Sequence, residues 1–335
     1  MNDLVKLAID AHNGSIERYS QGEAQETLRQ ALIEANGGST KLDYRAMRDG
    51  KCTGVFALVE EILKNTIPQG LQQNELFNAL VDYRNIAEGD DQIFHVDSSD
   101  LFFVDDIAKG TQGIRRQRLA NVKDVPVPMT VHGVRIYEEI SRILAGRVDF
   151  NELIDKVDQS VQSQILNEIY AAWIAMTATD FGGSVYVTST AGSYSDNDLL
   201  TMIEHVEAAA GGQNATIIGT KAALRPVATS SITFDPAKEA LYNEGFIGKF
   251  YGSPVVAIPQ RHVIGGTAFV YDDKTISIVA GDQKPIKFVL KGDPLIVPRD
   301  FSNNMDLTQE YFLAEEWGIA VAMAGNAGIG RYEFQ

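Results

Sequence analysis

The side chains that most often carry chemistry are few in this chain and lie far apart. Cys52 is the only cysteine, so neither an internal disulfide nor a thiolate metal cluster can form. The histidines show no HExxH or HxH spacing, and they are His12, His95, His132, His205 and His262. We therefore expect no metal site built from histidine or cysteine, and we interpret Cys52 as an inert residue.

Motifs for phosphate binding and nucleophilic catalysis are also missing. Neither GxxxxGK[ST] nor GxSxG occurs in the sequence. The glycines of 325–330 resemble a phosphate loop, but only five residues follow them, which leaves no helix N-terminus to receive a phosphate. The adjacent carboxylates at 105–106 and 272–273 lack the further ligands of a calcium loop. The sequence predicts no catalytic, cofactor-binding or metal-binding residues.

The sharpest charge pattern is a basic cluster in an acidic chain. The net charge is -16, yet the segment from 109 to 123 carries five cations and no acidic residue. Its cations are Lys109, Arg115, Arg116, Arg118 and Lys123. A negatively charged partner surface would attract this cluster, and the acidic remainder of an identical subunit is the simplest such surface. The alternative is a charged loop that is only solvated.

A long hairpin must position the basic cluster. Residues 92–104 and 121–137 are rich in Val, Ile, Phe and Thr, which predicts two strands around a wide tip. Pro126 and Pro128 cannot donate hydrogen bonds to a neighbouring strand, so the hairpin lies at an edge or outside a sheet. A two-stranded ribbon is marginally stable alone in water. We therefore expect it to lie on another surface, in its own chain or in a neighbour.

The element around which the chain is organised is a helix predicted over 151–178. This stretch contains neither glycine nor proline, and its apolar residues recur at three- and four-residue steps. Gly182 and Gly183 follow shortly afterwards and would stop it. At the rise of an α-helix it would be about 42 Å long. By itself it is typical of a long core helix.

Before the hairpin, weakly amphipathic segments predict helices over 16–35, 54–65 and 74–83, the second closed by Pro68. Short helices joined by polar linkers bury their apolar stripes poorly on one another, which indicates an arm that docks elsewhere. A small helical subdomain explains the same periodicity. A further short helix is predicted over 134–147.

Beyond the long helix the pattern is that of an α+β unit. A helix is predicted from Ser195 to Ala210, and Thr220 caps a second one that Pro226 breaks. The last predicted strand is Tyr311–Ala324, whose larger side chains share one face suited to packing on the long helix. The other strands are predicted at 185–190, 215–218, 246–258, 267–271, 276–279 and 286–290.

Composition limits the partners. An acidic chain lacks the basic face that a dedicated nucleic-acid binder needs. No apolar run reaches the roughly 18 residues of a membrane span, and the first residues do not form a secretory signal. We expect a protein made and assembled in a cytoplasm, without a membrane partner.

The order of these parts resembles a known family. The hairpin tip reads Gly113-Ile114-Arg115-Arg116-Gln117, and the stretch IYEEISRILAGRVDFNELIDKV spans 136–157. Later come ATIIGT at 215–220 and GSPVV at 252–256. From about Asp91 to the last residue, the chain resembles a tailed-phage major capsid protein of the HK-97-like fold.

The resemblance implies an α+β fold with four parts. Residues 1–90 would be an N-terminal helical arm, and 91–134 an extended loop across a neighbouring subunit. Residues 135–189 and 275–335 would form a peripheral domain whose spine is the helix 151–178, and 190–274 an axial domain. The basic residues Lys109, Arg115, Arg116, Arg118 and Lys123 would lie at contacts between subunits.

The resemblance also implies partners. Identical subunits would assemble as pentamers and hexamers into an icosahedral head shell of the virion that encloses double-stranded DNA without specific binding. Only some 35 residues precede the first Gly-Gly pair, so a separate scaffolding protein is expected rather than an internal scaffolding segment, beside portal and head-decoration proteins. Two alternatives stay open. One is an encapsulin-like bacterial compartment, and the other is a small-molecule α+β enzyme with its site in 195–225.

Overall fold

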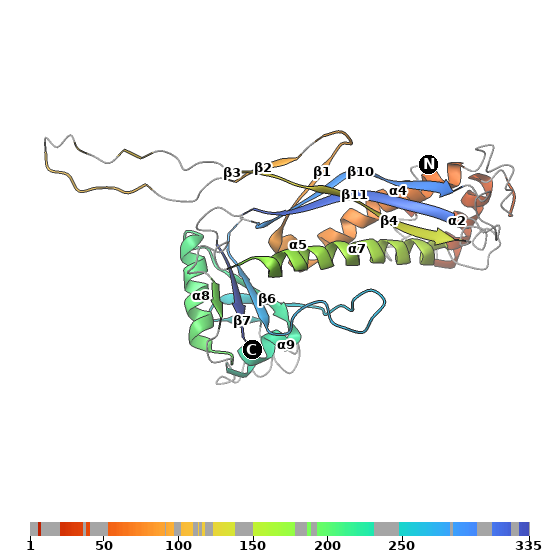
Figure 1. The fold of residues 1–335 in the computed structure, drawn as a ribbon. Coiled ribbons are helices and arrows are strands. Elements are labelled where there is room, and N and C mark those ends of the chain that lie inside the picture. The colour runs from red at the N-terminus through yellow and green to blue at the C-terminus, as the bar shows by residue number, and fades with distance from the viewer. Residues whose placement is uncertain are drawn as a thin grey trace.

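The computed structural model describes residues 6–7, 21–35, 38–40, 53–90, 92–96, 102–109, 113, 116–117, 123–137, 150–177, 186–188, 193–230, 248–281, 284–299, 310–322 and 328–334. Figure 1 shows an L-shaped body from which a long hairpin arm projects. One limb of the L is a sheet backed by the long helix, and the other is a smaller lobe below one end of that helix. The helices are α2 (Gln21–Ala35), α4 (Thr53–Gln72), α5 (Glu75–Leu80), α7 (Phe150–Ala175), α8 (Asp196–Ala209) and α9 (Lys221–Ser230).

A four-stranded sheet forms the longer limb. Its order is β1-β10-β11-β4, with β1 parallel to β10 and the other neighbours antiparallel. A bulge between Lys291 and Leu295 shifts the register of β10 against β11. The strands are β1 (Val81–Ile86), β4 (Met129–Tyr137), β10 (Ile286–Arg299) and β11 (Glu310–Val321).

The long helix α7 lies along one face of this sheet (Figure 1). Ile165, Ile169 and Trp173 follow one another at four-residue steps and are fully buried, as an amphipathic helix requires. α4 packs beside α7 and against β10. The predicted long helix is confirmed, and so is the strand predicted at 311–324, which is β11 and packs on the helix. It is not the last strand of the chain, because Ile329–Glu333 form another that was not predicted.

A six-stranded sheet forms the smaller lobe, in the order β5-β12-β9-β6-β8-β7. α8 packs against β12 and β9, and α9 against β6 and β8. The helix predicted from Ser195 is confirmed as α8, and Ser195 is its N-cap, with Oγ accepting a hydrogen bond from the Asp198 amide. The strands are β5 (Tyr186–Thr188), β6 (Thr216–Thr220), β7 (Lys249–Phe250), β8 (Ser253–Ile258), β9 (Thr275–Val279) and β12 (Ile329–Glu333).

Two predicted helix ends were wrong because packing outweighs the local cost of proline. α4 continues through Pro68 to Gln72, and Ile67 and Leu71 on either side of the proline are buried in the core. α9 likewise continues through Pro226, since Val227 and Ala228 are buried against the six-stranded sheet. Thr220 still caps this helix, with Oγ1 accepting from the Ala223 amide.

Three further segments differ from the sequence prediction. The helix expected over 74–83 ends at Leu80, and the chain continues as β1. Residues 134–137 of the helix expected over 134–147 belong to β4, and the rest of that helix lies outside the described residues. The strand expected at 267–271 is reduced to an isolated bridge between His262 and Phe269.

The structure also distributes some segments differently from the expected domains. α4 and β1 belong to the main core rather than to a separate arm, because Leu63, Phe77 and Val81 are buried in it. β9 and β12 pair within the six-stranded sheet, not with the rest of 275–335. The α+β fold with an extended hairpin and a long spine helix is confirmed, whereas the domain boundaries themselves stay a prediction.

Candidate assembly interface

The projecting arm starts from a short two-stranded root. β2 (Ile93–Val96) and β3 (Lys123–Pro126) pair antiparallel, with Ile93 opposite Pro126. The Val127 amide extends the pairing by donating to the Gln92 carbonyl, at 3.3 Å. This pair forms a sheet of two strands and joins neither larger sheet. The predicted hairpin is confirmed at this root alone: residues 102–104 are not in a strand, and 129–137 of the second predicted strand form β4 at the edge of the four-stranded sheet.

A single aromatic side chain anchors this root to the body. Phe94 on β2 is 1% exposed and packs with Val127 and Val289 in a small cluster of its own. The guanidinium carbon of Arg84 lies 4.1 Å from the centre of the Phe94 ring, and Lys287 Nζ lies 5.3 Å from it. Cations over an aromatic ring attract it electrostatically. The arm is thus fixed where it leaves the body.

Both cations around Phe94 are themselves placed by one carboxylate. Asp82 Oδ2 lies 3.0 Å from Lys287 Nζ and 3.7 Å from Arg84 Nη2. Asp82 and Arg84 are on β1, and Lys287 is opposite Asp82 on β10. The parallel pairing of β1 with β10 therefore positions the two cations that contact Phe94 at the root of the arm.

Farther out, the arm carries apolar side chains that its own chain leaves exposed. Phe103 is 66% exposed and Val104 95%, and Phe102 and Ile107 are more than half exposed. Contiguous apolar surface of this kind on a soluble protein marks an interaction site. The two limbs of the arm are joined by Gln117, whose amide donates to and accepts from the backbone of Phe103 at 2.7 and 2.8 Å.

The basic residues predicted from the sequence lie on this arm as far as the structure describes them. Lys109 and Arg116 are exposed. Lys123 begins β3, but its side chain is outside the description, as are Arg115 and Arg118 altogether. Their role in contacts between subunits therefore stays a prediction.

A second exposed apolar surface lies on the face of the four-stranded sheet that α7 does not cover. We call it the outer sheet face; Val131, Leu295, Val297 and Phe312 are its exposed apolar residues. Phe312 is paired with Val297 on β10 and with Arg135 on β4. Its ring leans over Gly133, where an added Cβ would collide with it. The glycine allows the aromatic ring to lie flat on the sheet.

The opposite, inner face of the sheet carries buried acids against α7. Glu315 on β11 is 5% exposed and faces Asp158 of α7, which is also buried. Burial raises the pKa of Glu315 to about 7, and the nearby Asp158 carboxylate adds to the shift. Nearer the other end of the strand, Trp317 Nε1 donates to Glu168 of α7 at 2.9 Å.

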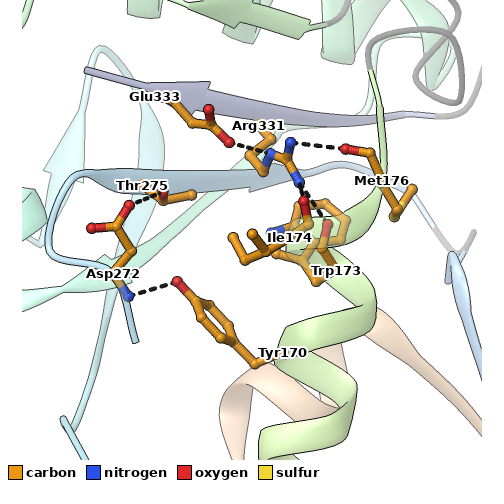
Figure 2. A network of polar contacts seen from close by, with 8 residues as sticks. All are labelled: Tyr170, Trp173, Ile174, Met176, Asp272, Thr275, Arg331 and Glu333. Carbon is orange, nitrogen blue, oxygen red and sulfur yellow. Dashed lines mark hydrogen bonds and ion pairs between the residues drawn. The ribbon is translucent and has the colours of Figure 1, made fainter. Parts of the chain in front are cut away.

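The C-terminal end of α7 is joined to the smaller lobe by a polar network, which we call the joint (Figure 2). Arg331 on β12 is 4% exposed. Its Nη1 donates to the carbonyls of Trp173 and Ile174, at 2.6 and 2.9 Å, and its Nη2 to that of Met176, at 2.8 Å. Arg331 Nε lies 2.8 Å from a carboxylate oxygen of Glu333. A buried guanidinium thus reaches carbonyls at the end of a helix.

One turn earlier, α7 makes a second polar contact with the same lobe. The Asp272 amide donates to the Tyr170 hydroxyl at 2.6 Å, and the rings of Tyr170 and Tyr271 meet edge to face. Asp272 also accepts from Thr275 at the start of β9 (Figure 2). Burial raises the pKa of Tyr170 to about 12, so its hydroxyl remains protonated at neutral pH.

A cleft lined by Asp155, Gln162, Arg261 and other residues lies between α4, α7 and the end of β8, outside the 195–225 unit where an enzyme site was the alternative. Among the described residues there is no cluster of three or more His, Cys, Asp or Glu side chains that could bind a metal ion. None of the helices in the described part of the chain is long and apolar enough to span a bilayer.

Comparison with known proteins identifies the family. The family described as "SPbeta prophage-derived putative capsid protein YonB" matches residues 1–331. The chain belongs to the YonB capsid-protein family. The protein is therefore a structural protein of a viral capsid, and the predicted resemblance to phage major capsid proteins is confirmed. No curated protein matches this capsid protein.

Solved structures show the fold of this capsid protein. The mature capsid of bacteriophage PhiM1 matches with a TM-score of 0.50 and 10% identity, over 77% of this chain and 86% of that one. A virus-like particle from Pyrococcus furiosus matches with a TM-score of 0.46 and 14% identity, over 82% and 98% of the two chains. The SrpI encapsulin of Synechococcus elongatus matches with a TM-score of 0.42 and 12% identity, over 77% and 86%. The first of these supports the HK-97-like fold.

Two features of this capsid protein escaped the sequence analysis. Phe94 belongs to the apolar segment predicted as a strand, but nothing local indicates that two cations surround it. The sequence contains only a weak indication of the joint. The last turn of α7 has no basic residue of its own to interact with the terminal carbonyls, so a cation from elsewhere could be expected there. The cation comes instead from Arg331, more than 150 positions later in the chain.

Proposed function

We propose that copies of this capsid protein assemble as pentamers and hexamers into a closed icosahedral head shell of a tailed phage. The arm is the observation that carries this proposal. It exposes Phe102, Phe103 and Val104 far from the body, while its root is firmly anchored through Phe94. A segment with an anchored base and an apolar, exposed length is suited to covering a neighbour rather than its own chain.

The surface that best complements the arm is the outer sheet face of a neighbouring copy. Exposed apolar side chains on both surfaces would be buried together, at roughly 25 cal/mol for each Å² removed from water. The basic residues Lys109, Arg115, Arg116, Arg118 and Lys123 would meet a body that is acidic overall. Charge complementarity between arm and body would then favour the correct register of contact.

The same acidic balance suits a shell that encloses double-stranded DNA without binding it specifically. A net charge of -16 gives little basic surface for phosphates, which dominate protein–DNA affinity. Assembly would take place in the host cytoplasm. A separate scaffolding protein, a portal and head-decoration proteins would complete the head.

Electron microscopy of the purified protein tests this proposal, with its scaffolding protein added if one is needed. We expect closed shells or ring-shaped capsomers. A monomer that stays monodisperse under every condition tested would contradict self-assembly. The contents of particles from the native source distinguish a phage head from an encapsulin-like compartment. Packaged DNA supports the phage head, whereas a co-purifying enzyme without DNA would indicate an encapsulin-like compartment.

A further inference from the structure

The long helix α7 is shared by the two limbs of the L. Along its middle it packs on the four-stranded sheet, where Glu168 accepts from Trp317. At its C-terminal end it meets the six-stranded lobe through Arg331 and through Tyr170. The joint therefore lies where the smaller lobe leaves the helix, beside the hydrophobic core that α7 shares with that lobe (Figures 1 and 2).

Arg331 lies at the C-terminal end of α7, where a cation stabilises a helix. The last carbonyls of a helix have no partner within it, and they carry the negative end of the helix dipole. α7 has no basic residue in its own last turn. The planar guanidinium supplies several donors in a fixed fork, so it contacts two carbonyls of the last turn, Trp173 and Ile174, together with that of Met176 just beyond the helix. Glu333 beside it balances the buried charge.

Two polar contacts on successive turns of α7 restrict the movement of the six-stranded lobe more than a single contact would. Arg331 alone would fix the distance between β12 and the helix end while allowing the lobe to pivot. The Tyr170 hydroxyl, bound by the Asp272 amide one turn earlier, gives a second fixed point that comes from a different strand connection. Together the two contacts restrict rotation as well as separation.

We propose that Arg331 is a positioning residue that sets the curvature of the assembled shell, by fixing the angle between α7 and the six-stranded lobe. This inference rests on the proposed function, that copies of the chain close into a shell. In an assembly of identical subunits, the rotation between neighbours follows from subunit shape, and it decides whether and where the assembly closes. A lobe that pivots would give several rotations and hence several particle sizes.

The test compares particle diameters for the wild type, Arg331→Lys and a control. Lysine keeps the charge but cannot form the fork, so the lobe should pivot without leaving an empty site. Leu224→Ala is the control, because Leu224 is buried in the same lobe on α9, away from the joint. We expect one diameter for the wild type and for the control, and mixed diameters or open sheets for Arg331→Lys.

The measurements distinguish an effect on shell curvature from a general loss of subunit stability. Thermal unfolding of each unassembled subunit shows how much each substitution destabilises it. Uniform shells of wild-type diameter from Arg331→Lys would overturn the proposal, and so would equally mixed diameters from Leu224→Ala. If Arg331→Lys does not fold, Tyr170→Phe removes only the second contact and should broaden the diameters by itself; an unchanged diameter would count against the joint. A wild type that forms no shells would contradict the proposed function instead.

Discussion

The arm and the joint differ in how much of their surface is buried within a single subunit. The joint buries a charged side chain and bonds it to three carbonyls at and just after the end of α7, so the guanidinium of Arg331 finds its partners inside the chain. The arm, by contrast, leaves Val104 95% exposed and depends on Phe94 and Gln117 for its internal order. One region is complete in a single copy, and the other is not.

This difference indicates which parts act within a subunit and which act between subunits. Buried groups at the joint and on the inner sheet face determine the shape and stability of a single copy. Exposed apolar and basic groups on the arm contribute little to that stability, and we assign them to contacts with other copies. Substitutions on the exposed length of the arm should therefore impair assembly with little effect on folding, whereas substitutions at the joint should alter the shape of the subunit and, through it, the size of the particles.

The largest effect is expected from reversing charge on the arm. Arg115→Glu combined with Arg116→Glu should block assembly, because like charges would then meet the acidic body of the neighbour. Circular dichroism of the unassembled subunit should be almost unchanged. Electron microscopy and sedimentation measure the assembly. A large loss of helical signal would mean that these residues stabilise the single copy instead.

Substitution of two phenylalanines compares the buried root of the arm with its exposed length. Phe94→Ala should lower the free energy of unfolding by about 3 kcal/mol, because it removes a fully buried ring and leaves a cavity. Phe103→Ala, at an exposed ring, should change it by less than about 0.5 kcal/mol while still weakening assembly. Denaturant titration provides both numbers. Equal losses of stability would contradict the division between root and length.

The buried acid Glu315 should make the stability of the subunit depend on pH. Its pKa is raised to about 7 in the folded chain, so the folded state binds a proton that the unfolded state has lost. This contribution is fully present below about pH 4.5 and is lost as pH rises through 7. The groups facing Glu315 are Asp158 on α7, Tyr83 on β1 and His132 on β4.

Glu315→Gln removes this titration. The free energy of unfolding of the variant should rise relative to the wild type between pH 5 and 7.5, by about 2–3 kcal/mol, given about 1.4 kcal/mol for each unit of pKa. Denaturant titrations at several pH values measure the difference between the two proteins. Parallel stability curves would show that the carboxylate is not desolvated as the structure indicates.

The smallest effect is expected at an exposed contact between a histidine and an aspartate on the arm's root. His95 Nδ1 and Asp124 Oδ1 lie 2.6 Å apart, but both side chains are more than half exposed. Exposed pairs contribute between zero and about 1 kcal/mol. Asp124→Asn should therefore change the unfolding midpoint only slightly and leave particle formation intact. A loss of shells would mean that this pair, rather than Phe94, fixes the arm.

Sequence patterns were informative where the signal is local. The steps of apolar residues in α7, the serine that caps α8 and the alternation in β11 all depend on neighbours within a few positions. The hairpin root could be predicted for the same reason. The exposed basic residues Lys109 and Arg116 could be placed on the arm, but the partner that we propose for them in another copy could not be identified from the sequence.

What the sequence missed depends on contacts between distant segments. β1 pairs with β10, where Asp82 and Lys287 are separated by 205 positions, and nothing local distinguishes that strand from a continuing helix. Burial of Ile67 and Leu71 carries α4 past Pro68, against the local preference. Arg331 looks like an ordinary strand residue until the end of α7 lies next to it.

Cryo-electron microscopy of an assembled particle tests the central claim most directly. We predict that residues 102–117 of each copy lie on the outer sheet face of a neighbour, with Phe103 and Val104 buried there. An assembled particle in which this segment folds back on its own body, or in which the outer sheet face remains open to solvent, would contradict the claim.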